Sequence, residues 1–219
     1  MAIACALLIL DLDGTCYFQT PVRLRMALRL AAHYGPRPRR WRELALVRDF
    51  RRARETDDSA TDQDLTATLA RRHRLPIGVA ATTLERWLLR EPLAAVAAHR
   101  DTLLADTIRD AARAGLRIAV LSDYPTEAKI AALGTCVDAQ FCTAEAPITA
   151  RKPSPKGVET VLAHFRVTPD QAVMVGDRES KDGAAARAAG VRAVILPKGR
   201  RGRRAAIAGL RQMVGLPPR

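Results

Sequence analysis

Short apolar runs alternate with stretches of helical periodicity over most of the chain. Five runs are typical of strands buried in a sheet, at residues 6–10, 117–121, 139–142, 172–175 and 191–196. Helical spacing of apolar residues predicts helices at 102–114, 125–133, 155–165, 182–189 and 203–214. Strictly alternating strands and helices favour a parallel sheet with right-handed crossovers. We therefore predict an α/β fold, with a Rossmann-like parallel sheet core and helices on both faces.

Residues 21–98 depart from this alternation, because helical spacing continues there with no strand signal. Four helices are expected, near 21–34, near 39–55, around Leu65 and Leu69, and from Val79 to Leu88. Thr20 and Pro21 are suited to the N-cap and first turn of the first helix, and the polar residues 56–59 predict a turn. We expect an all-helical domain at 21–98, inserted into a core made of 1–20 and 99–219.

Composition limits the possible partners. The formal charge is +13, and residues 192–219 hold eight basic residues and no acidic one. The basic tail carries no aromatic residue on which bases could stack, so we do not expect nucleic-acid binding despite the charge; 203–214 is expected to be a peripheral basic helix. No apolar stretch approaches the roughly 20 residues that span a bilayer, which favours a cytoplasmic protein without membrane contact, as a monomer or homodimer.

The four cysteines show no metal-ligand spacing and are expected to be reduced thiols. Cys16 lies beside an acidic loop, so its oxidation is a possible block of a site there.

Polar and charged residues that could take part in catalysis or ligand binding follow the predicted strands. Because the carboxyl ends of parallel strands meet at one edge of the sheet, where open α/β sheets bind ligands, we expect these side chains to converge. They are Asp11 and Asp13 after the first strand, Ser122 and Asp123 after the second, Lys152 in a Pro-rich loop, and Asp177 and Asp182 after the fourth.

Together these residues resemble the four motifs of the haloacid dehalogenase-like (HAD) superfamily of phosphoryl-transfer enzymes. The resemblance runs from Ala6 to about Pro197 and is to phosphatases of the phosphoglycolate phosphatase-like type, in which a helical insert forms a cap. An independent helical bundle without a catalytic role is the alternative for the insert. The resemblance implies Asp11 as nucleophile and Asp13 as general acid and then general base. A superfamily dehalogenase lacks the second acid, so its presence favours phosphate chemistry.

The resemblance also implies a magnesium site. Mg²⁺ would take a carboxylate oxygen of Asp11, the backbone carbonyl of Asp13 and the carboxylate of Asp177, with Asp182 in support. Asp182 can equally be read as the N-cap of the following helix.

Ser122, the main-chain amide of Asp123 and Lys152 are implied as phosphate-binding groups. Asp123 replaces the Asn more common in the family, and it can also be read as a cap for the helix after Pro125. Lys156 is the neighbour most easily confused with Lys152.

The sequence thus predicts a Mg²⁺-dependent phosphatase that hydrolyses a small phosphorylated metabolite through an aspartyl-phosphate intermediate. Two alternatives stay open: a sugar phosphomutase, and a regulatory or binding protein that keeps the fold without catalysis.

Overall fold

The chain divides into two compact units in a computed structural model that describes residues 5–56 and 61–218. One unit consists of Met1–Gln19 and Val96–Arg219, and the other of Thr20–Ala95. Most of the turn expected at 56–59 lies outside the described residues.

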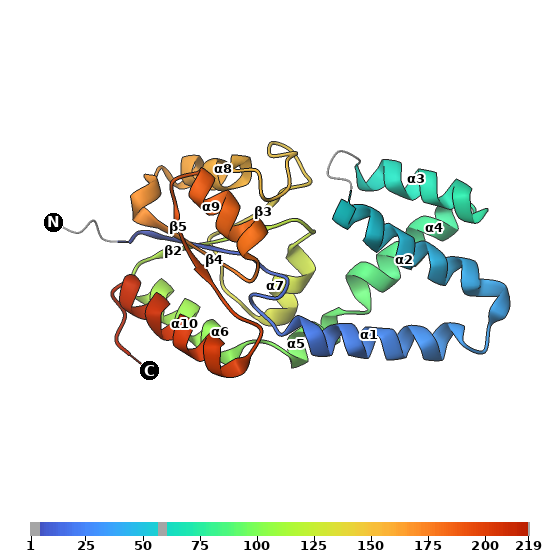
Figure 1. Cartoon of the computed structure of the whole chain (residues 1–219), viewed down its shortest axis with the longest axis horizontal. Helices are drawn as coiled ribbons and strands as arrows, with labels where there is room; N and C mark the ends of the chain where they lie inside the picture. Colours follow the sequence, from blue (N-terminus) through green and yellow to red (C-terminus); the bar gives the residue numbers. More distant parts are fainter. Residues whose placement is uncertain (1–4, 57–60, 219) are drawn as a thin grey trace. The chain divides into compact units, whose positions relative to one another are not determined.

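The first unit is built on a parallel sheet of five strands in the order β3-β2-β1-β4-β5 (Figure 1). The strands are β1 Leu7–Leu10, β2 Arg117–Ser122, β3 Ala139–Cys142, β4 Ala172–Gly176 and β5 Arg192–Ile195. β1 is central, and its last residue, Leu10, pairs with Val120 on one side and Val175 on the other. All four β1 residues are fully buried, which explains their unbroken apolar run.

Helices cover both faces of this sheet, so the α/β prediction is confirmed (Figure 1). One face carries α8 and α9, and the opposite face carries α6 and α10. Leu7 and Ile9 of β1 pack with Val158 and Val161 of α8 and Ala185 of α9. The helices of this unit are α6 Thr102–Arg113, α7 Glu127–Leu133, α8 Lys156–Phe165, α9 Ala184–Ala188 and α10 Arg200–Met213.

Two helices differ from expectation in ways that matter for the site. The helix expected at 182–189 begins as a π-helical turn, Glu179–Gly183, and α9 has Gly183 as its N-cap, so the reading of Asp182 as the N-cap is wrong. The C-terminal helix α10 is not peripheral, since Arg203 and Arg211 are buried in it beside apolar residues. Periodicity identified the helix but could not show that two of its arginines lie inside.

The second unit contains only helices among its described residues. They are α1 Gln19–Tyr34, α2 Trp41–Thr56, α3 Asp62–His73, α4 Ile77–Leu84 and a π-helical turn at Glu85–Arg90, with a short 3₁₀ turn at Pro38–Arg40. Helix α5, Leu93–Ala98, follows at the boundary between the units and was not expected from the sequence. α1 starts at Gln19, so Thr20 lies inside it and is not its N-cap.

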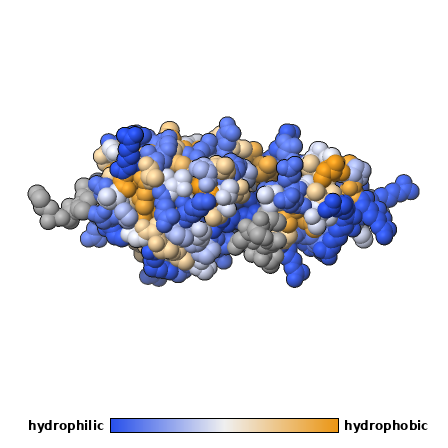
Figure 2. Space-filling view, turned by 90° about the horizontal axis from the view of Figure 1, so that it is seen from above, coloured by the Kyte–Doolittle hydropathy of each residue, from blue (hydrophilic) through white to orange (hydrophobic). Residues whose placement is uncertain are grey.

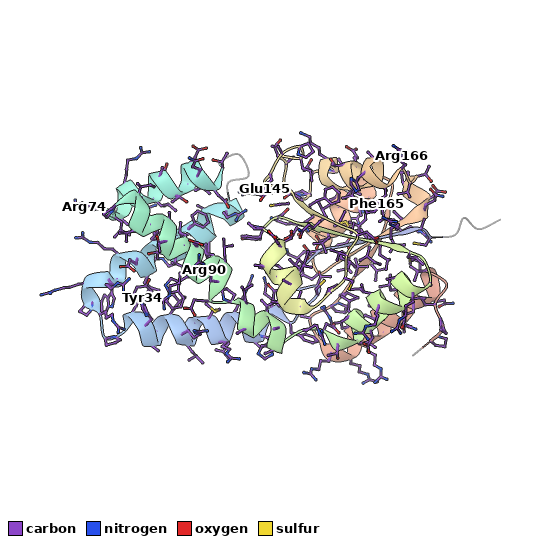
Figure 3. The ribbon with its side chains drawn as sticks, turned by 180° about the vertical axis from the view of Figure 1, so that it is seen from behind. Tyr34, Arg74, Arg90, Glu145, Phe165 and Arg166 are labelled. Carbon is purple, nitrogen blue, oxygen red and sulfur yellow. The ribbon has the colours of Figure 1, made fainter. Side chains whose placement is uncertain are left out.

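A buried polar network joins three segments of the helical unit. Tyr34, labelled in Figure 3 at the end of α1, donates its hydroxyl to Oε2 of Glu43 at 3.1 Å and accepts from Nε1 of Trp87 at 2.9 Å. Arg40 donates to both Glu43 oxygens, at 2.7 and 2.6 Å. Because each buried polar group has a partner, the network stabilises the unit rather than weakening it.

Polar and charged side chains dominate the face of the molecule seen in Figure 2, and hydrophobic ones lie in scattered groups. Within the described ranges, no helix has both the length and the apolar character that crossing a bilayer requires.

Candidate active site

The end of β1 places Asp11 at the carboxyl edge of the sheet. Its backbone N–H donates to the Val175 carbonyl at 2.8 Å, which continues the β1–β4 ladder to the carboxylate itself. The chain then turns at Gly14, where φ is +95° and a Cβ atom would stand 2.3 Å from Oδ2 of Asp177. Only glycine suits this position, because both the positive φ and the close carboxylate exclude a side chain.

Lys152 is the cation at the centre of the site. Its Nζ donates to Oδ1 of Asp11 at 2.5 Å, to Oδ1 of Asp182 at 2.7 Å and to the Leu121 carbonyl at 3.3 Å. The side chain is 2% exposed, whereas Lys156 is an exposed surface residue, so the structure separates the two lysines. Burial lowers the pKa of Lys152, but the carboxylates of Asp11 and Asp182 raise it more, and the ammonium stays charged.

The Asp11 carboxylate is held from both sides. Thr15 donates its hydroxyl to Oδ2 at 2.8 Å, opposite the Lys152 contact at Oδ1. Burial, followed by the charge of Asp182, raises the pKa of Asp11 to about 7, although Lys152 acts in the other direction. A fixed carboxylate whose two oxygens are both oriented is suited to in-line attack on an electrophile.

Asp11, Asp177 and Asp182 form a carboxylate cluster, with one oxygen of each within 4.8 Å of the others. Asp177 Oδ1 is buried with no hydrogen-bond partner among the described residues. Burial and the neighbouring Asp182 raise the pKa of Asp177. A buried carboxylate oxygen without a donor, next to two other acids, fits a hard divalent cation such as Mg²⁺, which prefers oxygen ligands.

Asp182 differs from the other two acids because both its oxygens already have donors. Oδ1 accepts from Lys152, and Oδ2 accepts from the backbone amides of Asp177 and Arg178 at 3.2 and 3.1 Å. These bonds orient the loop that carries Asp177. Because donors already occupy both oxygens, Asp182 has less capacity than Asp177 to ligate a cation directly.

Ser122 and Asp123 lie at the end of β2, beside the Lys152 loop. Ser122 is buried, and its Oγ accepts from the Tyr124 N–H at 3.2 Å. Asp123 Oδ1 accepts from Thr143 Oγ1 at 2.7 Å and from the Lys152 N–H at 3.2 Å. Helix α7 starts only at Glu127, so the reading of Asp123 as its cap is wrong. Its carboxylate instead anchors the Lys152 backbone, a role that the sequence did not suggest.

Asp13 points toward a different set of groups. Tyr17 donates its hydroxyl to Oδ1, and Nζ of Lys129 lies 2.6 and 2.7 Å from the two carboxylate oxygens. Burial raises the pKa of Asp13, but Lys129 and Tyr17 lower it more, and the net shift is downward. Sequence reasoning missed Lys129, because a lysine on an amphipathic helix usually lies on the solvated face.

Cys16 is buried, and its thiol donates to the backbone carbonyl of Asp11 at 3.3 Å. All four cysteines are free. Burial, followed by the charge of Asp11, raises the pKa of Cys16. The thiolate needed for oxidation is therefore disfavoured here, which argues against the oxidation block considered from the sequence.

The fold and the site together define the class of protein. A parallel sheet that gathers carboxylates and a buried ammonium at its carboxyl edge is an α/β architecture suited to anionic ligands and a divalent cation. Residues 5–190 match the haloacid dehalogenase-like hydrolase family, and the chain belongs to it. The family expected from the four motifs is thus confirmed.

Comparison with individual proteins agrees with this assignment. The chain is 35% identical to a phosphoserine phosphatase from Thermus thermophilus over 98 residues, 43% of this chain and 39% of that protein, so the match spans well under half of the relative. Among solved structures, a 2-haloacid dehalogenase from Pseudomonas syringae has a TM-score of 0.65 at 18% identity, covering 88% of this chain and 86% of that one. A HAD phosphatase from Thermococcus onnurineus has a TM-score of 0.62 at 19% identity, covering 96% and 98%. The two solved structures show the fold alone.

Proposed function

We propose that the protein is a Mg²⁺-dependent phosphatase that hydrolyses a small phosphorylated metabolite through an aspartyl phosphate on Asp11. The observation that carries the proposal is the contact of Lys152 with Asp11 and Asp182, beside the buried Oδ1 of Asp177, which accepts no hydrogen bond from the described residues. Asp11 and Asp177 directly follow β1 and β4, Lys152 lies in the loop between β3 and α8, and Asp182 lies in the π-helical turn after β4. Their charged groups nevertheless lie close together. The phosphatase relative from Thermus adds support over the part of the chain that it matches.

In the first half of the reaction, an Asp11 oxygen attacks phosphorus, the bond from phosphorus to the leaving oxygen breaks, and Asp13 protonates that oxygen. In the second half, Asp13 takes a proton from water, which attacks the aspartyl phosphate, releases inorganic phosphate and restores Asp11. The lowered pKa of Asp13 keeps its carboxylate deprotonated, which is the form that the second half requires. For the acid half, Asp13 has to gain a proton once the substrate is bound.

The remaining residues bind and orient the phosphoryl group. Lys152 places a positive charge between the nucleophile and the transferred group, and Ser122 with the amide of Asp123 offers hydrogen-bond donors. Mg²⁺ would be held by Asp11, Asp177 and the Asp13 carbonyl, with Asp182 orienting the loop. When bound, Mg²⁺ supplies charge that offsets the repulsion between carboxylate and phosphoryl oxygens. The helical unit would act as the cap that selects the substrate.

The decisive experiment is phosphate release from an aryl phosphate, with Mg²⁺ and with EDTA, by the parent and by Asp11→Asn. Activity that needs both Mg²⁺ and Asp11, together with a hydroxylamine-labile phosphoprotein after rapid quenching, supports the proposal. Isomerisation of a sugar phosphate without phosphate release would indicate the phosphomutase instead, and halide release from a 2-haloacid would indicate a dehalogenase. Binding of phosphate esters without turnover would indicate a regulatory protein.

A further inference from the structure

Arg203 of the C-terminal helix reaches the loop that follows the nucleophile. Its guanidinium is buried, and each of its three nitrogens has a partner in the core. Nε donates to the Asp101 carboxylate, Nη1 to the Gly14 carbonyl at 3.1 Å, and Nη2 to the Thr15 carbonyl. The planar fork of arginine suits this three-way contact, which a lysine ammonium on its flexible stem cannot reproduce.

Asp101 connects the same loop to helix α6. Its side chain caps α6 by accepting from the Leu104 N–H at 3.1 Å, and its backbone N–H donates to the Cys16 carbonyl at 3.0 Å. Three consecutive carbonyls of the loop are therefore held by the two residues of one ion pair: Arg203 binds those of residues 14 and 15, and the backbone N–H of Asp101 binds that of residue 16. We call this arrangement the Arg203–Asp101 clamp.

The Arg203–Asp101 clamp affects the orientation of the Asp11 carboxylate through Thr15. Because peptide units are planar and trans, fixing the carbonyls of Gly14 and Thr15 fixes the orientation of the peptide units on either side of the Thr15 α-carbon. The Thr15 hydroxyl then donates to Oδ2 of Asp11 at 2.8 Å. Movement of the clamp would displace this donor and, with it, one of the two groups that orient the Asp11 carboxylate.

We propose that Arg203 is a positioning residue for the catalytic loop, which makes the basic C-terminal helix part of the active-site scaffold. Its effect on turnover rests on the proposed phosphatase function, whereas its effect on the loop does not. Buried contacts therefore explain Arg203 and Arg211, two of the five arginines of α10, without an external anionic partner.

Helix α10 itself offers a matched control. Arg211 is as buried as Arg203 and pairs with Asp110 Oδ2 at 2.8 Å, but its other partners are Thr107 and the Pro217 carbonyl, away from the loop. Arg203→Met and Arg211→Met each remove a buried guanidinium from the same helix. We expect comparable losses in the free energy of unfolding and different effects at the loop.

The first measurement is the rate at which Cys16 reacts with a thiol reagent, in a background where Cys5, Cys136 and Cys142 are serine. Cys16 is buried in the loop, so its reaction reports local opening. We expect about tenfold faster labelling in Arg203→Met than in Arg211→Met, compared under conditions of equal global stability. Equal rates in the two variants would overturn the inference, whether or not the parent hydrolyses phosphate esters.

The second measurement separates kcat from KM. We expect Arg203→Met to lower kcat by about 10- to 100-fold with little change in KM, because misplacing a reacting group affects the chemical step. Arg203→Lys should recover part of kcat, and Arg211→Met should keep it. If the parent is active and Arg203→Met keeps its kcat, the catalytic part of the inference is refuted. If the parent is inactive, the proposed function is refuted, and the labelling rates alone decide whether Arg203 positions the loop.

Discussion

Nζ of Lys152 lies 2.5 Å from Oδ1 of Asp11, although 141 positions separate the two residues in the sequence. The pair is buried, and the ammonium also contacts Asp182. Removing it would leave two acids facing each other without a cation, and an uncompensated buried charge costs about 3–5 kcal/mol.

We therefore predict that Lys152→Met lowers the free energy of unfolding of the first unit by about 3–5 kcal/mol. We also predict that it lowers kcat/KM by at least about 100-fold. Urea unfolding and phosphate-release kinetics measure the two effects. Lys156→Met is the matched control, because Lys156 is exposed and surface changes usually stay within about 0.5 kcal/mol. Equal behaviour of the two variants would show that Lys152 is not the phosphate-binding cation.

Gly14→Ala tests the carboxylate cluster. The new Cβ would meet Asp177 Oδ2 at 2.3 Å, so the Asp177 carboxylate has to leave its position in the cluster. We expect the Mg²⁺ concentration for half-maximal activity to rise by about 10- to 100-fold, as for other changes that disturb the groups around a metal. Gly115→Ala is the control, since its φ is +90° but nothing lies within 4 Å of the added carbon. An unchanged Mg²⁺ requirement in Gly14→Ala would argue against Asp177 as a ligand.

The helical unit provides a pH-dependent stability test at Glu43. Burial raises the pKa of Glu43, but hydrogen bonds from Arg40 and Tyr34 lower it more, and it lies below the ordinary 4.5. A carboxyl group whose pKa is lower in the folded state than in the unfolded state stabilises the fold when the pH is above its unfolded-state pKa. This stabilisation is lost as the pH falls through its folded-state pKa. Glu43→Gln should thus be less stable than the parent at pH 7, and the gap should narrow below about pH 4.5.

Both tryptophans, Trp41 and Trp87, lie in this unit, so their fluorescence during urea unfolding reports on it. Glu85→Gln is the control, because Glu85 is half-exposed in an ion pair with Arg90, a type of pair that contributes about 0–1 kcal/mol. A stability gap for Glu43→Gln that stays constant from pH 7 to pH 3 would contradict the assignment.

The parts predicted correctly from the sequence depend on burial and on chain order. The unbroken apolar run before Asp11 marks a strand enclosed on both faces, and parallel alternation then places the end of each strand at one edge. From this logic, Asp11, Lys152 and Asp177 are expected to lie together at the carboxyl edge of the sheet.

The parts that the sequence could not predict are polar residues buried by long-range packing. Lys129 is 116 positions from Asp13, and Arg203 is 188 from Thr15. Hydrophobic periodicity identifies the apolar face of a helix, but it cannot tell a solvated basic residue from one that reaches inward at the edge of that face. For the same reason, the sequence predicted that the basic helix at 203–214 lies at the periphery, although Arg203 and Arg211 are buried.

Lys129 provides the last test, since its ammonium contacts both oxygens of Asp13. Removing this cation should raise the pKa of Asp13, because a nearby positive charge favours the ionised form by about one to three pKa units. If Asp13 is the general base, the acidic limb of the pH profile for hydrolysis of the aspartyl phosphate, measured in a single turnover, moves to higher pH in Lys129→Met. Lys129→Arg keeps the charge and should keep the limb, and Tyr17→Phe, which removes only a hydrogen bond, should shift it less. A limb that does not move in Lys129→Met would assign the acid–base role to a group other than Asp13.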